Sequence, residues 1–330
     1  MGAATFAAVL LAVPGQLAVA ETTPYTPSTM ARNAASAPPG QPLPGLTAGE
    51  RARFDAGRAA FERSRSIGTG LGPVFNDSAC NRCHNKKGVG GAGIQSARLA
   101  GRSEAGAFDP LLEAGGPSLA QNTVMLEPRS DIERLIPRCP LTRDGEPVPA
   151  RANVLVRRRT TPLFGLGLVD ATPDASFVEL ARLQPAAIRG RPARVLDRVT
   201  GQASLGKLGW KAQATSLFHF SGLALLFELG VTSPDFPEEQ APGGDAAALA
   251  ACDATPEPED DGREVAALAD FMRLLAPVAP LPRDADARAG DALFTRFGCD
   301  GCHVRELVSG PSPITALSRK AYAPFSDFLL

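Results

Sequence analysis

Aromatic residues and long hydrophobic runs are both scarce in this 330-residue chain. Aromatics make up only 6% of it, with a single Trp, and no basic stretch is interleaved with them, which excludes the usual pattern of a nucleic-acid-binding surface. The net charge of −1 likewise argues against a general polyanion binder. After the first 20 residues no stretch predicts a transmembrane segment, because the nearest, Leu217 to Val231, is short and contains His219 and Glu228.

Positive charge is absent from the start of the chain, where the first Lys or Arg is Arg32. Residues 1–20 nevertheless predict a signal peptide, because the apolar run from Ala3 to Val13 precedes a small-x-small cleavage site at 18–20. A disordered apolar tail is the alternative. Export would place the protein in the periplasm. Residues 21–46 are polar and proline-rich, and we expect them to form a mobile spacer.

Glycine and proline are abundant, at 33 and 30 residues, which predicts many turns and long irregular connections. The first helix is expected at Thr47, where Thr47 and Glu50 can form a capping box and Phe54 and Phe61 share one face. Further helices are expected at 177–183, 214–229, 265–275 and from Asp284 onward. We expect residues 85–120 to be loop around a cofactor, and a strand at 153–161 that pairs with 123–126.

The segment 232–261 holds nine acidic residues and no Lys or Arg. A solvated surface loop is the favoured interpretation, and a docking patch for a basic redox partner is the alternative.

Six cysteines are present, and four of them lie in two Cys-x-x-Cys-His motifs. The remaining pair, Cys139 and Cys252, can form a disulfide in an exported chain or can stay as two buried thiols, and the sequence leaves both open.

The two motifs, Cys80 to His84 and Cys299 to His303, predict two covalently bound haem c groups. Cysteines three apart lie on one face of a helical turn and can add across the two vinyl groups of a porphyrin, and the next His is then the proximal iron ligand. The cofactor-binding residues are therefore Cys80, Cys83, Cys299 and Cys302, and the iron ligands are His84 and His303. Zinc bound by four thiolates is the alternative, but zinc does not require a His after each second Cys.

Several segments around these motifs resemble the di-haem oxidoreductase family, whose members are often labelled "thiol oxidoreductase" or peroxidase. The resemblance covers about residues 50–330 and rests on these segments in order: Gly70 to Asn76, Gly88 to Gly91, Thr161 to Asp170, Leu208 to Ala212, Glu228 to Ser233, and Gly290 to Phe294.

The resemblance implies a mainly α fold of two cytochrome-c-like helical domains, with long Gly/Pro-rich loops and a few short strands. The first haem domain would span 47–283 with family-specific insertions, and 284–330 would begin a second domain. That second domain is expected to be incomplete, because only 27 residues follow His303 whereas family members continue further. Relatives also suggest a calcium ion between the haems.

Four other residues are candidates for the chemistry between and above the haems. Trp210 is the only Trp, and related peroxidases use a Trp as an electron relay between haems, although a buried core residue is equally compatible. His219 is a candidate distal ligand or proton shuttle, with a satisfied core histidine as the alternative. Glu228 is a candidate general acid–base group or a helix-end charge. Met125 is a candidate sixth iron ligand.

These observations favour a periplasmic di-haem oxidoreductase of peroxidase type, with one electron-transfer haem and one haem that binds hydrogen peroxide or a similar small oxidant. The expected electron donor is a small soluble protein of the cytochrome c or cupredoxin type. A non-catalytic di-haem electron-transfer cytochrome is the alternative function, and a truncated, non-functional product is a third.

Overall fold

The computed structural model describes residues 34–329, so the predicted signal peptide 1–20 and half of the spacer 21–46 lie outside the described residues. The α-helices in the described part are α1 Ala48–Glu62, α2 Cys80–Cys83, α3 Arg129–Leu135, α4 Leu166–Asp170, α5 Asp174–Leu183, α6 Leu217–Leu229, α7 Ala246–Cys252, α8 Arg263–Leu274 and α9 Ala285–Arg296. The strands there are β1 Val74–Phe75, β2 Ser96–Glu104, β3 Ala107–Asp109, β4 Ser118–Leu119, β5 Asn122–Thr123, β6 Val154–Arg159, β7 Ala193–Asp197, β8 Gln202–Gly206, β9 Leu307–Val308 and β10 Ala321–Tyr322.

The fold is mixed α and β, and the expectation of a mainly α, cytochrome-c-like fold was wrong. Helices account for 36% and strands for 17% of the structure, and the strands form four small antiparallel sheets. In the largest sheet β2 pairs with β3, β4 and β6. The division into two haem domains at residue 284 stays a prediction.

The pairing of β2 with β6 explains why the strand content was underestimated. The ladder runs from Ser96 opposite Arg159 to Gly101 opposite Val154. Strand β2 lies inside the segment 85–120 that was expected to be loop, whereas β6 confirms the strand expected at 153–161. Neither strand alternates between buried and exposed residues, so neither shows the period of two that marks a half-buried strand. Residues 123–126 do not pair with β6: β5 pairs with β1, and Val124–Leu126 forms a 3-10 turn.

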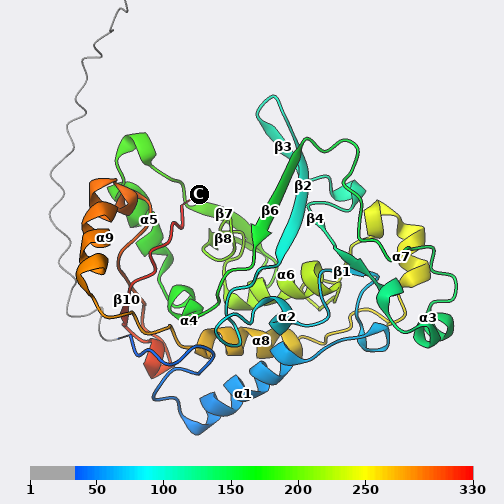
Figure 1. Cartoon of the computed structure of the whole chain (residues 1–330), viewed down its shortest axis with the longest axis horizontal. Coiled ribbons are helices and arrows are strands. Elements are labelled where there is room, and N and C mark those ends of the chain that lie inside the picture. The colour runs from blue at the N-terminus through cyan, green and yellow to red at the C-terminus, as the bar shows by residue number, and fades with distance from the viewer. Residues whose placement is uncertain (1–33, 330) are drawn as a thin grey trace, which may run out of the picture.

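Helix α1 packs extensively against α8 along the lower side of the molecule in the view of Figure 1. The predicted capping box is confirmed, since the Thr47 hydroxyl accepts from the Glu50 N–H at 3.2 Å. Phe54 and Phe61 on α1 contact Phe271 on α8, with ring centroids 5.3 and 4.7 Å apart. Helix α6 lies against the other side of α8 and is apolar nearly all round, as expected for a helix inside a core.

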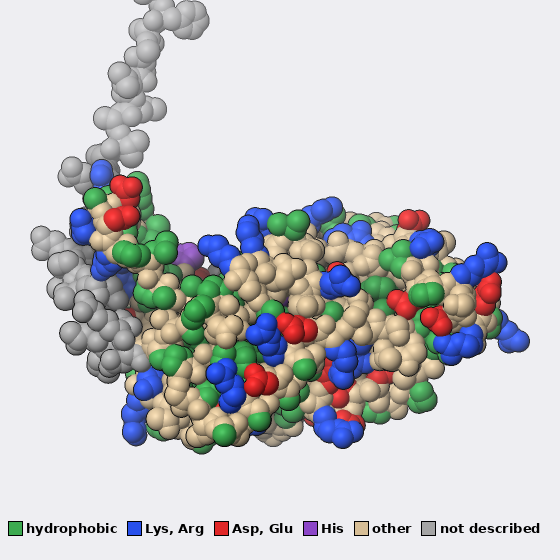
Figure 2. Space-filling model, turned by 60° about the horizontal axis from the view of Figure 1, so that its bottom comes forward, with side chains coloured by type: hydrophobic (Ala, Val, Ile, Leu, Met, Phe, Trp, Pro, Cys, Tyr) green, Lys and Arg blue, Asp and Glu red, His purple; other side chains and the backbone are tan. Residues whose placement is uncertain are grey.

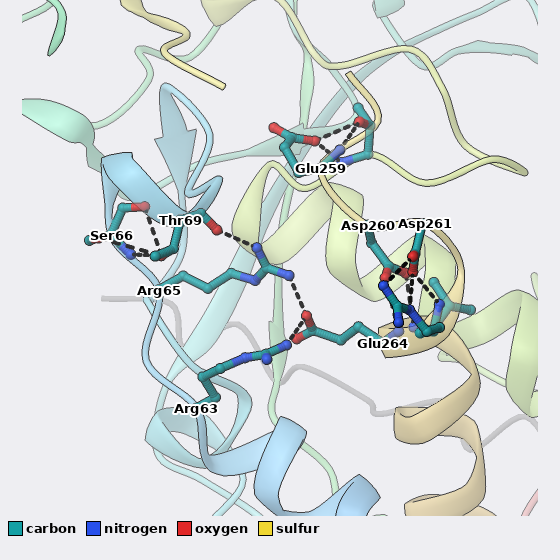
Figure 3. Close-up of polar contacts among 11 residues, drawn as sticks. Arg63, Arg65, Ser66, Thr69, Glu259, Asp260, Asp261 and Glu264 are labelled. Atoms are coloured by element: carbon teal, nitrogen blue, oxygen red, sulfur yellow. Dashed lines mark hydrogen bonds and ion pairs between the residues drawn. The ribbon is translucent and has the colours of Figure 1, made fainter. Parts of the chain in front are cut away.

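Charged side chains fix the start of α8 next to the glycine-rich segment that follows α1 (Figure 3). The Asp260 carboxylate accepts from the backbone N–H groups of Glu264 at 2.9 Å and of Val265 at 3.0 Å. The buried Glu264 carboxylate binds the guanidinium groups of both Arg63 and Arg65. These contacts hold the chain between α1 and the first Cys-x-x-Cys-His motif against α8.

The other helices expected at 177–183, 214–229, 265–275 and after Asp284 are confirmed as α5, α6, α8 and α9. The acidic segment 232–261 is not a simple solvated loop, because it contains α7 and buries Thr232, Ser233 and Asp260.

Cys139 and Cys252 form a disulfide, which ties the chain after α3 to the end of α7. Within residues 34–329 no helix combines the length and apolar character needed to cross a bilayer. On the face drawn in Figure 2, basic and acidic side chains are interspersed.

Gly57 offers a direct test of the α1–α8 contact. A Cβ at this position would lie 2.2 Å from the Ala267 carbonyl oxygen, whereas a Cβ at Gly49 on the same helix would meet nothing within 4 Å. We expect Gly57→Ala to lower the free energy of unfolding by about 2 kcal/mol or more, because backbone atoms of two helices must move apart. Gly49→Ala should be neutral or stabilising by up to ~1 kcal/mol. Urea unfolding followed by circular dichroism measures both, and equal effects would contradict this packing.

Candidate functional site

The first Cys-x-x-Cys-His motif forms the short helix α2 and its C-terminal cap. The His84 N–H donates to the Cys80 carbonyl oxygen at 3.0 Å, so the two cysteines and the histidine follow one helical turn. The His84 Nδ1 lies 3.0 Å from the carbonyl oxygen of Thr161, which comes just after β6. Since a carbonyl only accepts, Nδ1 carries the proton and Nε2 is left as the lone-pair nitrogen. Burial lowers the pKa of His84, which favours the neutral imidazole that binds metal.

The second motif repeats this arrangement after α9. The His303 N–H donates to the Cys299 carbonyl oxygen at 2.8 Å, and His303 Nδ1 lies 3.1 Å from the carbonyl oxygen of Phe325. A phenylalanine of the preceding helix faces each imidazole, Phe61 at 6.1 Å from His84 and Phe294 at 6.3 Å from His303 between ring centroids. The order of helix, glycine-containing segment and motif therefore occurs twice in this structure.

The residues at both motifs fit haem. All four cysteines of the motifs are free thiols, and both imidazoles have Nδ1 held by a backbone carbonyl, as haem-ligating histidines require. Leu293 on α9 and Phe297 directly after α9 are 44% and 73% exposed. These exposed apolar side chains lie close to the second motif in the sequence and offer apolar surface for a porphyrin.

The alternative of a four-thiolate zinc site is not supported. Within residues 34–329 the one group of His, Cys, Asp or Glu with converging ligand atoms is acidic and contains no cysteine. Burial together with the negative charge of Glu264 and Glu228 raises the pKa of Cys80 to about 12, and burial with Asp77 raises that of Cys83 to about 11. Both are therefore thiols at neutral pH, unlike the low-pKa cysteines of redox-active dithiols.

Glu228 lies beside the first motif, at the last turn of α6. Its side chain is half-buried, and its negative charge raises the pKa of both Cys80 and Cys83. The Asn76 Nδ2 donates to Glu228 Oε2 at 2.8 Å, and the Asn76 N–H donates to the Glu228 carbonyl oxygen at 2.7 Å. Burial raises the pKa of Glu228, and the bond from Asn76 opposes that rise. Glu228 lies at the end of α6, as the helix-end interpretation expected, but its carboxylate is half-buried and bonded to Asn76; its role as a general acid–base group stays a prediction.

Sequence reasoning did not single out Asn76 and Gln121 as members of this site. Gln121 Nε2 donates to Asn76 Oδ1 at 3.3 Å, which orients the Asn76 amide toward Glu228. The only signal in the sequence was that Asn76 ends the segment Gly70 to Asn76 that resembles the family.

Trp210 is 46% exposed, so the alternative of a buried core residue was wrong. Its indole Nε1 donates to the carbonyl oxygen of Arg159 at 3.2 Å, and Arg159 ends β6 two residues before Thr161. Trp210 and His84 are therefore bonded to the same short backbone segment, which places the indole at the surface behind the first motif.

His219 is buried at the first turn of α6, nine residues before Glu228 and thus about 13 Å away along the helix. Its Nδ1 lies 3.1 Å from the Thr215 hydroxyl, which donates to Asp197, and its ring stacks on Phe236 at 5.6 Å. These contacts match a satisfied core histidine, and the role of His219 as a distal ligand stays a prediction.

Met125 is half-buried in the 3-10 turn Val124–Leu126, and its role as an iron ligand stays a prediction. The same holds for the calcium ion expected between the haems.

The half-buried carboxyl of Glu228 predicts a pH-dependent stability. The pKa of Glu228 is higher in the folded protein than its ordinary value of 4.5. This carboxyl therefore stabilises the folded state fully below pH 4.5, and that stabilisation is lost as the pH rises through the folded-state pKa. Glu228→Gln keeps an acceptor for Asn76 without a charge, so its melting temperature should match the wild type near pH 4 and exceed it at pH 8. The exposed Glu113→Gln should show no such divergence. A constant difference at both pH values, measured by thermal unfolding, would contradict the burial of an ionisable Glu228.

Comparison with known proteins agrees with the site. The family model described as "Di-haem oxidoreductase, putative peroxidase" matches residues 150–330, which include Trp210, His219, Glu228 and the second motif but not the first. No curated protein and no solved structure matches the chain. The match extends over more than half of the chain and includes a Cys-x-x-Cys-His motif whose geometry is repeated at residues 80–84, and the chain belongs to the di-haem oxidoreductase family.

Proposed function

We propose that this protein is a periplasmic di-haem c-type cytochrome that reduces hydrogen peroxide or a similar small oxidant. The observation that carries the proposal is the half-buried Glu228–Asn76 pair beside the first motif, because it puts a carboxyl with a raised pKa next to a haem attachment site. Cys80 and Cys83 would hold the first haem and Cys299 and Cys302 the second. A haem iron supplies, when bound, the centre that accepts peroxide and exchanges electrons.

The chain's own residues would have separate parts in the reaction. His84 and His303 are oriented as axial ligands by the carbonyl groups on their Nδ1 atoms. Glu228 holds a proton at its carboxyl and can pass it to a departing peroxide oxygen, with Asn76 keeping the carboxyl in place. Reduction of one hydrogen peroxide to two waters consumes two protons and two electrons. We assign the electrons to a small soluble donor of the cytochrome c or cupredoxin type.

The assignment to the periplasm is supported by two features. The Cys139–Cys252 disulfide is typical of an oxidising compartment, and residues 1–20 carry the expected signal sequence. The alternative of a non-catalytic electron carrier relied on the acidic segment 232–261 as a docking patch. That patch is smaller than its sequence suggests, because Asp260 and the carboxylate of Glu239 in this segment are buried.

Protein exported with haem maturation should have a mass higher than the polypeptide by two haem groups and should oxidise a reduced donor when peroxide is added. Glu228→Gln should then lower kcat/KM for peroxide by about 10²- to 10⁴-fold, as for loss of a general acid. Haem content should not change, because Glu228 attaches to no haem.

His219→Gln serves as the comparison variant, since His219 lies about 13 Å from Glu228 along α6. If His219→Gln caused the large loss and Glu228→Gln did not, proton transfer would belong to His219. Two low-spin haems that are unchanged by peroxide would instead support the electron-carrier function.

Trp210→Phe tests the relay. The half-exposed indole is bonded to the backbone next to the His84 anchor, so its loss should slow electron delivery to the first haem without altering haem content. Stopped-flow measurement of haem reoxidation would detect this. Unchanged rates in Trp210→Phe would remove Trp210 from the electron path.

A further inference from the structure

Four carboxylates converge at a place that the haem chemistry does not use. Glu239, Asp253, Glu257 and Glu259, here called the acidic cluster, each contribute a carboxylate oxygen, and these oxygens all lie within 4.8 Å of one another. They come from the chain between α6 and α8, with Asp253 directly after α7. Four like charges this close repel one another strongly unless protons or a cation compensate them.

The two carboxylate oxygens of Glu239 are hidden from solvent and accept no hydrogen bond from an N–H or hydroxyl group of the described chain. Each of its two oxygens exposes less than 1 Å², and the same is true of Oε1 of Glu259. The other Glu259 oxygen accepts from the N–H and hydroxyl of Thr232. Burying a carboxylate without a hydrogen-bond donor destabilises the fold. Because the Glu239 oxygens are hidden from water and close to three other carboxylates, a cation bound among the four groups would remove this destabilisation.

No Lys or Arg of the described residues compensates the negative charge of the acidic cluster through an ion pair. Among residues 34–329 no Lys or Arg forms an ion pair with a member of the acidic cluster, and the nearby Arg65 is bound to Glu264 and to the Thr69 carbonyl oxygen (Figure 3). Burial and the charges of its three neighbours raise the pKa of Glu239 to about 10, and that of Glu259 rises to about 7.

We propose that the acidic cluster binds a calcium ion. All its side-chain ligands are carboxylate oxygens, which suit hard divalent cations, and no nitrogen or sulfur ligand for a transition metal is among them. Calcium fits better than magnesium because four carboxylates from irregular connections can bind in mono- or bidentate fashion in the variable geometry that calcium accepts, whereas magnesium demands a near-ideal octahedron.

This site differs from one between the two haems. Asp253 follows α7, and α7 lies at the opposite end of the molecule from α9, which leads into the second motif (Figure 1). Glu239 Oε1 lies against Gly72 and Gly230, so that a Cβ at Gly72 would be 2.3 Å from this oxygen. A bound ion would therefore fasten the acidic segment to the glycine-rich chain that approaches the first motif, next to the Cys139–Cys252 disulfide.

The test uses the holoprotein with both haems, stripped with a chelator and titrated with calcium chloride by calorimetry and by thermal unfolding. We expect one calcium per chain and a higher melting temperature with calcium than with an equal concentration of magnesium. Glu239→Gln and Asp253→Asn should each weaken calcium binding about tenfold or more, since affinity follows the ligand charge count. Glu238→Gln, at an exposed neighbour, should bind as the wild type does.

The melting temperature of one variant, measured with and without calcium, distinguishes a metal site from a purely structural role. In the stripped protein Glu239→Gln should melt above the wild type, because one repelling charge is removed, and with calcium it should melt below. Asp253→Asn gives the same test if Glu239→Gln does not fold. The proposal would be overturned if the wild type took up no calcium, or if Glu239→Gln and Asp253→Asn bound calcium as tightly as the wild type. Haem mass and peroxide turnover are measured separately and test the proposed function.

Discussion

The contact between α1 and α8 is the constraint on which the candidate site depends. Gly57 lets the two helix backbones meet, and Phe61 then packs on Phe271 with one side and faces the His84 imidazole with the other. At the start of α8 the Glu264 carboxylate holds Arg63 and Arg65, which begin the segment leading to Cys80. One helix pair thus positions both the proximal side of the first motif and the chain that enters it.

Each motif is completed by a segment distant in sequence. Thr161 supplies the carbonyl group for His84 and Phe325 supplies it for His303, so the tautomer of each imidazole is set by tertiary structure. At the first motif the same segment after β6 also receives the Trp210 indole through Arg159. The half-exposed indole and the His84 imidazole are therefore joined through the short backbone segment from Arg159 to Thr161.

Buried negative charge is concentrated around the first motif. Glu264 is neutralised by two arginines, Glu228 has only the Asn76 amide, and the acidic cluster has no cation of the described chain. These three arrangements predict three different behaviours: a stable ion pair, a carboxyl whose pKa is raised, and a site that takes up a metal ion.

The sequence by itself determined the two motifs, the capping box at Thr47, the main helices and the family, because each depends on residues close in the chain or on a fixed pattern of residue types. It did not determine the fold class, since β2 carries no alternating pattern and becomes a strand by pairing with the predicted strand β6, whose residues lie more than 50 positions away in the sequence. Likewise, nothing local joins Asn76 to Glu228, Cys139 to Cys252, or Glu239 to Asp253. Only the tertiary structure decided these, because burial and the approach of distant segments set which charges are paired and which are left to a ligand.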